Sequence, residues 1–275
     1  MRRLLHPLRR CALLTLGFSP CAFAGSVMQL DMKEYYEDPP VISTIEISTQ
    51  GRSSRMEVTG GGDDAGGMIW RGESADMVAI DHDSREYYVL DRASMERMAE
   101  RLGDAMQAMQ KELERMPPEQ RAMAEQMMKK HLPRQAAPAE PATLHATGRT
   151  DAIGGYDCAY YEVRRAEVKL RELCVTPWDE LPDGRSMSVA MLEMAGFLES
   201  MASTFAEGTG MDVMGGQQEI FQYMRELDGY PVLTRELDES GKVTSETVLR
   251  SADERDLEPA VFQPPAGYAR RDPEF

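Results

Sequence analysis

The amino-acid sequence predicts an α+β fold in which an antiparallel sheet carries inserted amphipathic helices. Apolar and polar residues alternate with a period of two in short segments separated by turn residues, as expected for strands with one buried face. Twice along the chain this period changes to the three-to-four-residue spacing of a helix. Strands follow strands without the strand–helix–strand alternation of a parallel sheet. We therefore predict an antiparallel sheet with one polar face, and helices packed on the other.

The first residues predict a secretory signal peptide. Arginines precede a short apolar run, Cys11–Phe18, which is far below the roughly 20 residues of a membrane-spanning helix. Ala22-Phe23-Ala24 matches the A-x-A pattern that precedes a cleavage site. We expect residues 1–24 to be removed and residues 25–275 to form a single domain.

Two other interpretations of the leader fit the sequence less well. Cys21 as a lipid anchor would need a small residue where Pro20 stands. Arg9-Arg10 as a twin-arginine export signal lacks matching residues around it, although the choice between the two export routes stays open.

The charge of the chain restricts its partners. The formal net charge is −16, and loss of the signal peptide removes four arginines and no acidic residue, which lowers it to −20. A chain this acidic is repelled by nucleic-acid phosphates and by anionic membrane surfaces. No later apolar run is long enough to span a bilayer. The prediction is a periplasmic or secreted protein that neither binds nucleic acid nor spans a membrane.

Cys158 and Cys174 remain after cleavage, and an even number of cysteines in an exported chain predicts a disulfide. Both lie equally far from a turn centred on Ala166. We expect them directly opposite each other in a hairpin, a register that also places Tyr161 opposite Arg171. A metal pair or a redox pair is disfavoured because the spacing is not C-x-x-C.

The predicted strands are, in order, 28–32, 41–48, 52–59, 68–71, 77–81, 85–90, the two arms of the cysteine hairpin, 230–237 and 243–250. Gly60–Gly67 lacks the Lys-Ser/Thr of a phosphate-binding loop, so it is interpreted as a hairpin loop. Asp81-His82-Asp83-Ser84 could offer metal ligands, but one turn supplies too few of them. An exposed, solvated turn is expected there.

The helices are rich in methionine. The first apolar stripe comprises Met95, Met98, Leu102, Met106, Met109, Leu113 and Met116. Pro117-Pro118 ends this helix, and a second runs to about His131, which gives a helical insert over about 92–132. A Pro/Ala linker over 133–142 follows, extended rather than helical. A further stripe comprises Met187, Met191, Met194, Leu198, Met201 and Phe205.

Methionine is unbranched and polarizable, so a sheet covered by such helices could enclose an adaptable apolar cavity. The candidate ligand-facing residues are Met95, Met98, Leu102, Met106, Met109, Met191, Met194 and Leu198. The alternative is that these side chains fill a closed core. Thioethers also favour Cu(I), but M-x-x-M spacing is what a packed helix requires. Only Met211 and Met214, in a glycine-rich stretch, form a weak copper candidate, and no cofactor is expected.

Nothing in the sequence predicts catalysis. There is no G-x-S-x-G motif, and His82, His131 and His145 are not paired in sequence with a nucleophile. The acidic residues are too numerous to single out a catalytic pair.

Several segments, together with the predicted signal peptide, carry a family resemblance: Arg55–Gly60, Asp81-His82-Asp83 before Tyr87-Tyr88, Gly154–Cys158, Cys174–Trp178, Asp228–Val232 and Phe262–Tyr268. Together they resemble an uncharacterised bacterial family of exported, methionine-rich proteins. That family is similar in fold to the lipoprotein carriers LolA and LolB and to RseB-type envelope-stress sensors.

The resemblance implies an antiparallel half-barrel whose concave face is covered by the inserted helices. It implies binding of a lipid or acyl chain, or of an envelope protein as in the stress sensors. It transfers no functional residue, because no counterpart of the carriers' arginine latch is found.

Overall fold

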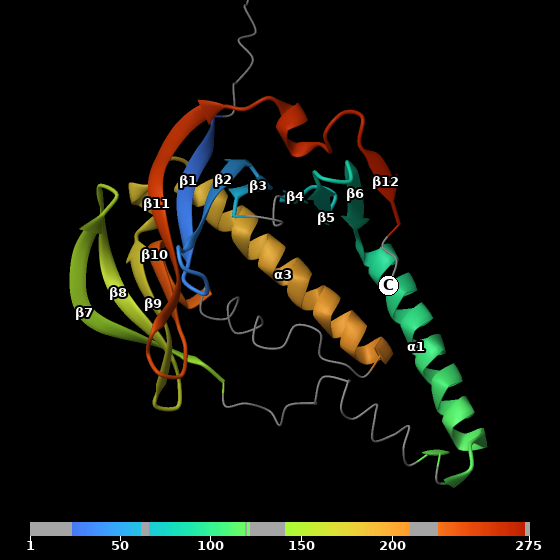
Figure 1. Cartoon of the computed structure of the whole chain (residues 1–275). Helices are drawn as coiled ribbons and strands as arrows, with labels where there is room; N and C mark the ends of the chain where they lie inside the picture. The colour runs from blue at the N-terminus through green and yellow to red at the C-terminus, as the bar shows by residue number, and fades with distance from the viewer. Residues whose placement is uncertain (1–23, 62–65, 119, 122–140, 210–224, 273–275) are drawn as a thin grey trace, which may run out of the picture.

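The computed structural model describes residues 24–61, 66–118, 120–121, 141–209 and 225–272. They form one open sheet of 12 strands and two long helices (Figure 1). The strand order is β12-β6-β5-β4-β3-β2-β1-β11-β10-β9-β8-β7. All neighbouring strands are antiparallel except β12, which lies parallel to β6. The antiparallel prediction is therefore confirmed for the sheet apart from this one short edge strand.

The first half of the chain contains β1 (Ala24–Glu34), β2 (Val41–Gln50), β3 (Ser53–Gly60), β4 (Gly66–Arg71), β5 (Asp76–Asp81), β6 (Glu86–Leu90) and α1 (Arg92–Arg115). The second half contains β7 (Thr143–Ile153), β8 (Tyr156–Arg165), β9 (Val168–Thr176), the 3₁₀ turn η1 (Trp178–Glu180), α3 (Gly184–Thr209), β10 (Tyr230–Leu237), β11 (Val243–Asp256), the 3₁₀ turn η2 (Pro259–Phe262) and β12 (Ala269–Arg271).

The two halves of the chain meet at β1 and β11, which pair over the whole length of β1. Met28 and Leu249, both fully buried, lie on these two strands. They belong to the largest core cluster, together with Met187 of α3. Since β1 also pairs with β2, the N-terminal strand sits in the middle of the sheet and joins its two halves.

The structure joins Cys158 to Cys174 in a disulfide, but the predicted register is wrong. Cys174 lies opposite Tyr160, not opposite Cys158. The turn occupies Ala166 and the residue after it, and Ala166 adopts a left-handed φ of 50°. A bulge between Val163 and Arg164 moves the pairing further, so the two cysteines are diagonal neighbours.

Helix α3 packs against one face of the sheet. Phe197 on α3 lies with its ring centroid 5.2 Å from that of Trp70 on β4. At the N-terminal part of the helix, Met187 is 1% exposed and belongs to the main core. The methionine stripe predicted on this helix thus faces the sheet over its first turns.

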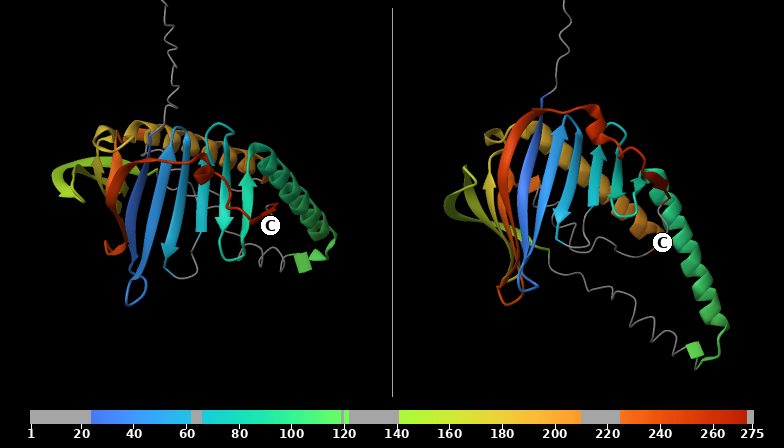
Figure 2. Two further views of the ribbon diagram at one scale, coloured as in Figure 1. Left: turned by 90° about the horizontal axis from the view of Figure 1, so that it is seen from above. Right: turned by 45° about the horizontal axis from the view of Figure 1, so that its top comes forward.

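The C-terminal segment, residues 257–271, crosses the opposite face of the sheet. Phe262 and Val261 pack with Ile69 and Val78, whose side chains are fully buried. Ile69 and Trp70 are consecutive in β4 and so point to opposite faces. Figure 2 shows the result: α3, in orange, follows one side of the sheet, and the C-terminal segment, in red, crosses the other.

Helix α1 begins after Asp91, whose carboxylate Oδ1 accepts a hydrogen bond of 2.6 Å from the N–H of Ser94. Ser94 Oγ in turn accepts from the N–H of Asp91, so the two residues form a reciprocal cap. The helix ends at Arg115, just before the predicted stop at Pro117-Pro118. It packs on α3 and extends away from the sheet at the end where β6 and β12 lie (Figure 1).

Most of the predicted second helix and the Pro/Ala linker lie outside the described residues, as does the leader except for Ala24. In the part of the chain that the structure describes, no helix combines the length and the apolar character needed to cross a bilayer.

Candidate functional site

The predicted ligand-facing residues of α1 divide into two groups along the helix. Near its N-terminus, Met95 is 8% exposed and packs with Ala99, while Met98 and Leu102 are partly buried beside Met201 of α3. Further along, Met106 is partly buried and Met109 is 41% exposed. The apolar stripe therefore continues beyond the part of α1 that is buried.

The candidates on α3 also differ in their surroundings. Met191 packs against the main core beneath the helix. Met194 and Leu198 are partly buried on the helix. Met211 and Met214, the copper candidates, lie outside the described residues.

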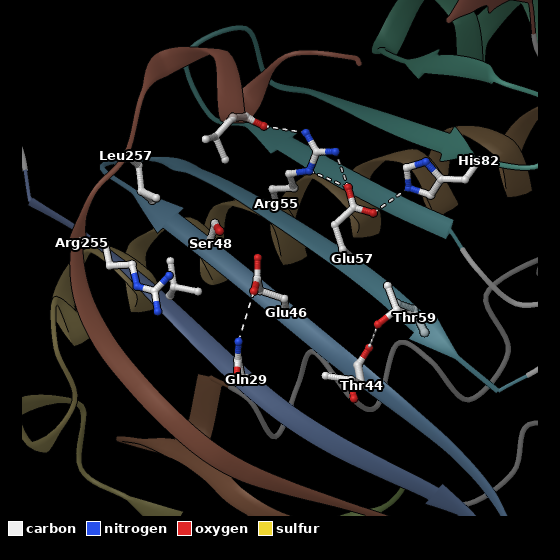
Figure 3. Close-up of a pocket in the computed structure, with 13 residues that line it drawn as sticks. Gln29, Thr44, Glu46, Ser48, Arg55, Glu57, Thr59, His82, Arg255 and Leu257 are labelled. Atoms are coloured by element: carbon white, nitrogen blue, oxygen red, sulfur yellow. Dashed lines mark hydrogen bonds and ion pairs between the residues drawn. The ribbon is translucent and has the colours of Figure 1, made fainter. Parts of the chain in front are cut away.

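A second site, absent from the sequence-based predictions, is a groove on the face of the sheet opposite α3 (Figure 3). The groove has a volume of about 930 Å³. Strands β1, β2 and β3 form its floor, and Leu257 and Val261 of the C-terminal segment form one wall. It is lined by Val27, Gln29, Thr44, Glu46, Ser48, Arg55, Glu57, Val58, Thr59, His82, Arg255, Leu257 and Val261.

A chain of polar contacts fixes one side of the groove. Arg55 forms an ion pair with Glu57 on the same strand, with Nε of Arg55 2.6 Å from Oε1 of Glu57. His82 Nε2 lies 2.7 Å from Oε2 of Glu57, and His82 Nδ1 lies 2.9 Å from the hydroxyl of Tyr268. A carboxylate can only accept, so Nε2 carries the proton in this contact. In the neutral ring, Nδ1 then accepts from Tyr268.

The same polar chain is attached to the C-terminal segment at two points. Tyr268 supplies one of them, and the other is the Val261 carbonyl, which accepts a hydrogen bond of 2.8 Å from Nη1 of Arg55. The three side chains Arg55, Glu57 and His82 therefore hold the groove wall against the sheet.

Two local features allow this arrangement: space beside Glu57, and a fixed turn that holds His82. Gly67 lies opposite Glu57 on β4, and a Cβ at Gly67 would come within 2.6 Å of the Glu57 carboxylate. In the β5–β6 turn, Oδ1 of Asp81 accepts hydrogen bonds from the N–H groups of Ser84 and Asp83, at 3.0 and 2.9 Å. These hydrogen bonds lower the pKa of Asp81, and the bond from Ser84 has the larger effect. The same bonds fix the turn that presents His82.

The expectation of a solvated Asp81–Ser84 turn is wrong for His82. Its side chain is 29% exposed, and both ring nitrogens have partners. No cluster of three or more His, Cys, Asp or Glu side chains suited to a metal occurs in the described ranges. The signal available in the sequence was the alternation that sets Arg55 and Glu57 on one face of their strand. Their partners, at positions 82 and 268, are too far away in sequence for that pattern to identify.

A separate charge network crosses the cysteine-hairpin side of the sheet. Glu172, 8% exposed, lies opposite Glu162 and makes ion pairs with Arg149, Lys169 and Arg235 at 2.8, 3.4 and 3.3 Å. Burial is the largest single influence on the pKa of Glu172 and would raise it. Its contacts with Lys169 and Arg149 together outweigh burial and lower the pKa. These groups satisfy one another and link β7 to β10, so the network is structural.

Comparisons with known proteins give likenesses of structure only. No family model and no curated protein sequence matches the chain. An uncharacterized conserved protein from Thermus thermophilus has 10% identity and a TM-score of 0.43, and covers 89% of this chain and 90% of that one.

Two further solved structures are similar to the chain at comparably low identity. MucB, in the MucA/MucB complex of Pseudomonas aeruginosa, has 9% identity and a TM-score of 0.38 and covers 89% of this chain. This chain spans 57% of that one. A LolA superfamily protein from Nitrosomonas europaea has 10% identity and a TM-score of 0.31, and covers 88% of this chain and 90% of that one. All three TM-scores lie below 0.5, so the fold and the sites described above stand on this chain's own residues.

Proposed function

We propose that this chain is an exported, non-catalytic protein of the cell envelope that binds an apolar ligand, a lipid or acyl chain, beside α1 and α3. The observation that supports this is the incomplete burial of α1. Its apolar stripe extends over most of the helix, yet the buried members are confined to the first turns, at Met95 and Ala99. Beyond them Met109 is 41% exposed. An amphipathic helix of a soluble protein normally buries its stripe along its length, so this part is suited to cover a ligand.

The disulfide supports the export half of the proposal, because such bonds persist in oxidising compartments. The half-barrel interpretation adds a place for the ligand: α3 lines one face of the sheet, and the free part of α1 would close over an acyl chain from the side. Methionine side chains would adapt to chains of varied length.

Native mass spectrometry of the protein purified from the periplasm without detergent tests the proposal. We expect a co-purifying mass of lipid size that is lost on denaturation. The double variant Met106→Gln, Met109→Gln should lose it, since two amides on the ligand-facing stripe oppose an apolar chain. Val168→Gln, at an exposed apolar position at the start of β9, is the matched control and should retain it. A clean apo mass in the wild-type protein would contradict lipid binding.

The alternative function is docking of an envelope protein. The same exposed part of α1 would then contact a partner helix rather than a lipid. A clean apo mass, together with a partner cross-linked through position 109 in the periplasm, would favour this second function.

A further inference from the structure

The groove opposite α3 has charges that its own residues do not neutralise. Glu57 is compensated by Arg55 and His82. Glu46 lies directly opposite Glu57 across β2 and β3, and like charges in this position repel each other. Among the described residues Glu46 accepts only from Nε2 of Gln29, at 3.4 Å. This carboxylate therefore faces the groove without a counter-ion.

A cation faces the other end of the same groove. Arg255 lines it with a side chain that is 55% exposed. Within the described ranges its closest carboxylate is Asp253, 4.0 Å away, at the outer limit of an ion pair. Figure 3 shows Arg255 and Glu46 on the same side of the sheet, with Gln29 between the strands they come from.

The surface near these two charges can hydrogen-bond and can pack apolar groups. Ser48 and Thr44 present hydroxyls from the floor, and Val27, Leu257 and Val261 offer apolar contact. The volume of about 930 Å³ is at the upper end of the range of small-molecule sites. A ligand that suits this surface has a positive end, a negative end and a body that is both polar and apolar.

We propose that the groove binds a short peptide in extended form, with its ammonium group at Glu46 and its carboxylate at Arg255. The register sets the length. Gly25 lies opposite Arg255 and Gln29 lies opposite Glu46. These two β1 residues are separated by roughly 13 Å of strand. Glu46 and Arg255 lie on the strands on either side of β1, roughly 10 Å apart across the sheet. The diagonal between them is about 16 Å, the length of about five extended residues. This site is independent of the apolar ligand proposed for the helices, because it lies on the other face of the sheet.

Isothermal titration of the full exported chain with alanine–valine peptides of about three to seven residues tests the site. The peptides are used in four forms: with free ends, N-acetylated, C-amidated, and with both caps. In the wild-type protein each cap should weaken binding of the best peptide about tenfold, since it removes a charge-assisted contact. Acetylation should have no effect on the Glu46→Gln variant, and amidation none on Arg255→Gln.

Two controls and three contrary outcomes complete the design. Glu239→Gln and Arg101→Gln remove exposed charges of the same kinds elsewhere and should bind like the wild type. Equal affinity for free and doubly capped peptides, or no binding at millimolar concentration, would overturn the proposal. So would glycerophosphoethanolamine, a lipid headgroup with the same two charges, if it bound more tightly than every peptide.

Discussion

Nε2 of His82 lies 2.7 Å from Oε2 of Glu57, and this contact joins the β5–β6 turn to β3. Because the same ring reaches Tyr268, one residue of β3, one of the β5–β6 turn and one of the C-terminal segment share a single hydrogen-bonded chain. The wall of the groove is therefore positioned by three side chains that are far apart in sequence. The next two predictions test this chain from either end.

Replacing Tyr268 by Phe removes the hydroxyl that contacts His82 and leaves the ring in its apolar cluster. We expect the free energy of unfolding to fall by about 1 kcal/mol, the typical net value of one hydrogen bond. Amide hydrogen exchange over 257–271 should speed up more than exchange elsewhere. Tyr87→Phe in the same cluster is the control, because the Tyr87 hydroxyl has no partner among the described residues. Equal exchange in the two variants would show that the Tyr268 contact does not hold the segment.

Replacing Gly67 by Ala places a methyl group where the Glu57 carboxylate now lies. Glu57 must then move and lose its contacts with Arg55 and His82, and we expect a loss of about 1–3 kcal/mol in a urea unfolding experiment. Gly196→Ala in α3 is the matched control. A Cβ there meets no atom within 4 Å, so alanine should stabilise the helix by up to about 1 kcal/mol. If Gly67→Ala left the free energy of unfolding unchanged, the Glu57 side chain would have another position of equal energy, and the prediction would be wrong.

Removing the disulfide with the double variant Cys158→Ala, Cys174→Ala should cost about 3 kcal/mol, because the bridge closes a loop over a sequence separation of 16. Thermal unfolding with and without reductant measures this. The reductant should lower the midpoint of the wild-type protein and leave that of the double variant unchanged. A wild-type midpoint that does not respond to reductant would show that the bond does not stabilise the fold.

Asp91, the N-cap of α1, should make stability depend on pH. The hydrogen bond from the N–H of Ser94 is the main cause that lowers the pKa of Asp91. Since the folded value lies below the roughly 3.9 of an unfolded chain, the ionised cap adds stability above that pH, and this is lost as pH falls through the folded value. Asp91→Ala should cost about 1 kcal/mol at pH 7 and less in acid.

Asp91→Asn separates charge from capping, because asparagine caps a helix without titrating. Its stability relative to the wild-type protein should improve as the pH falls from about 5 to about 2. Urea unfolding followed by far-UV circular dichroism checks both Asp91 variants. A difference between wild type and Asn variant that does not change with pH would contradict the role given to the ionised cap.

Much of the fold could be predicted from local pattern. The period-two segments predicted most of the strands, as at 28–32 within β1 and 230–237, which is β10. The methionine spacing predicted α1 and α3, and Pro117-Pro118 predicted the end of α1. These features depend on neighbours in the chain, so a sequence contains them directly. The pairing of Cys158 with Cys174 also followed from counting, since only two cysteines remain after the predicted leader.

The register of the cysteine hairpin and the groove were decided by tertiary structure. A bulge at Val163 and Arg164 moved Cys174 opposite Tyr160, and the spacing of two cysteines does not reveal a bulge. The groove needs β11 to bring Arg255 beside β1, and the C-terminal segment to bring Tyr268 to His82. His82 and Tyr268 are 186 positions apart in the sequence, and local periodicity carries no information about contacts over such separations. Their geometry is set by long-range pairing and packing, which only the folded chain determines.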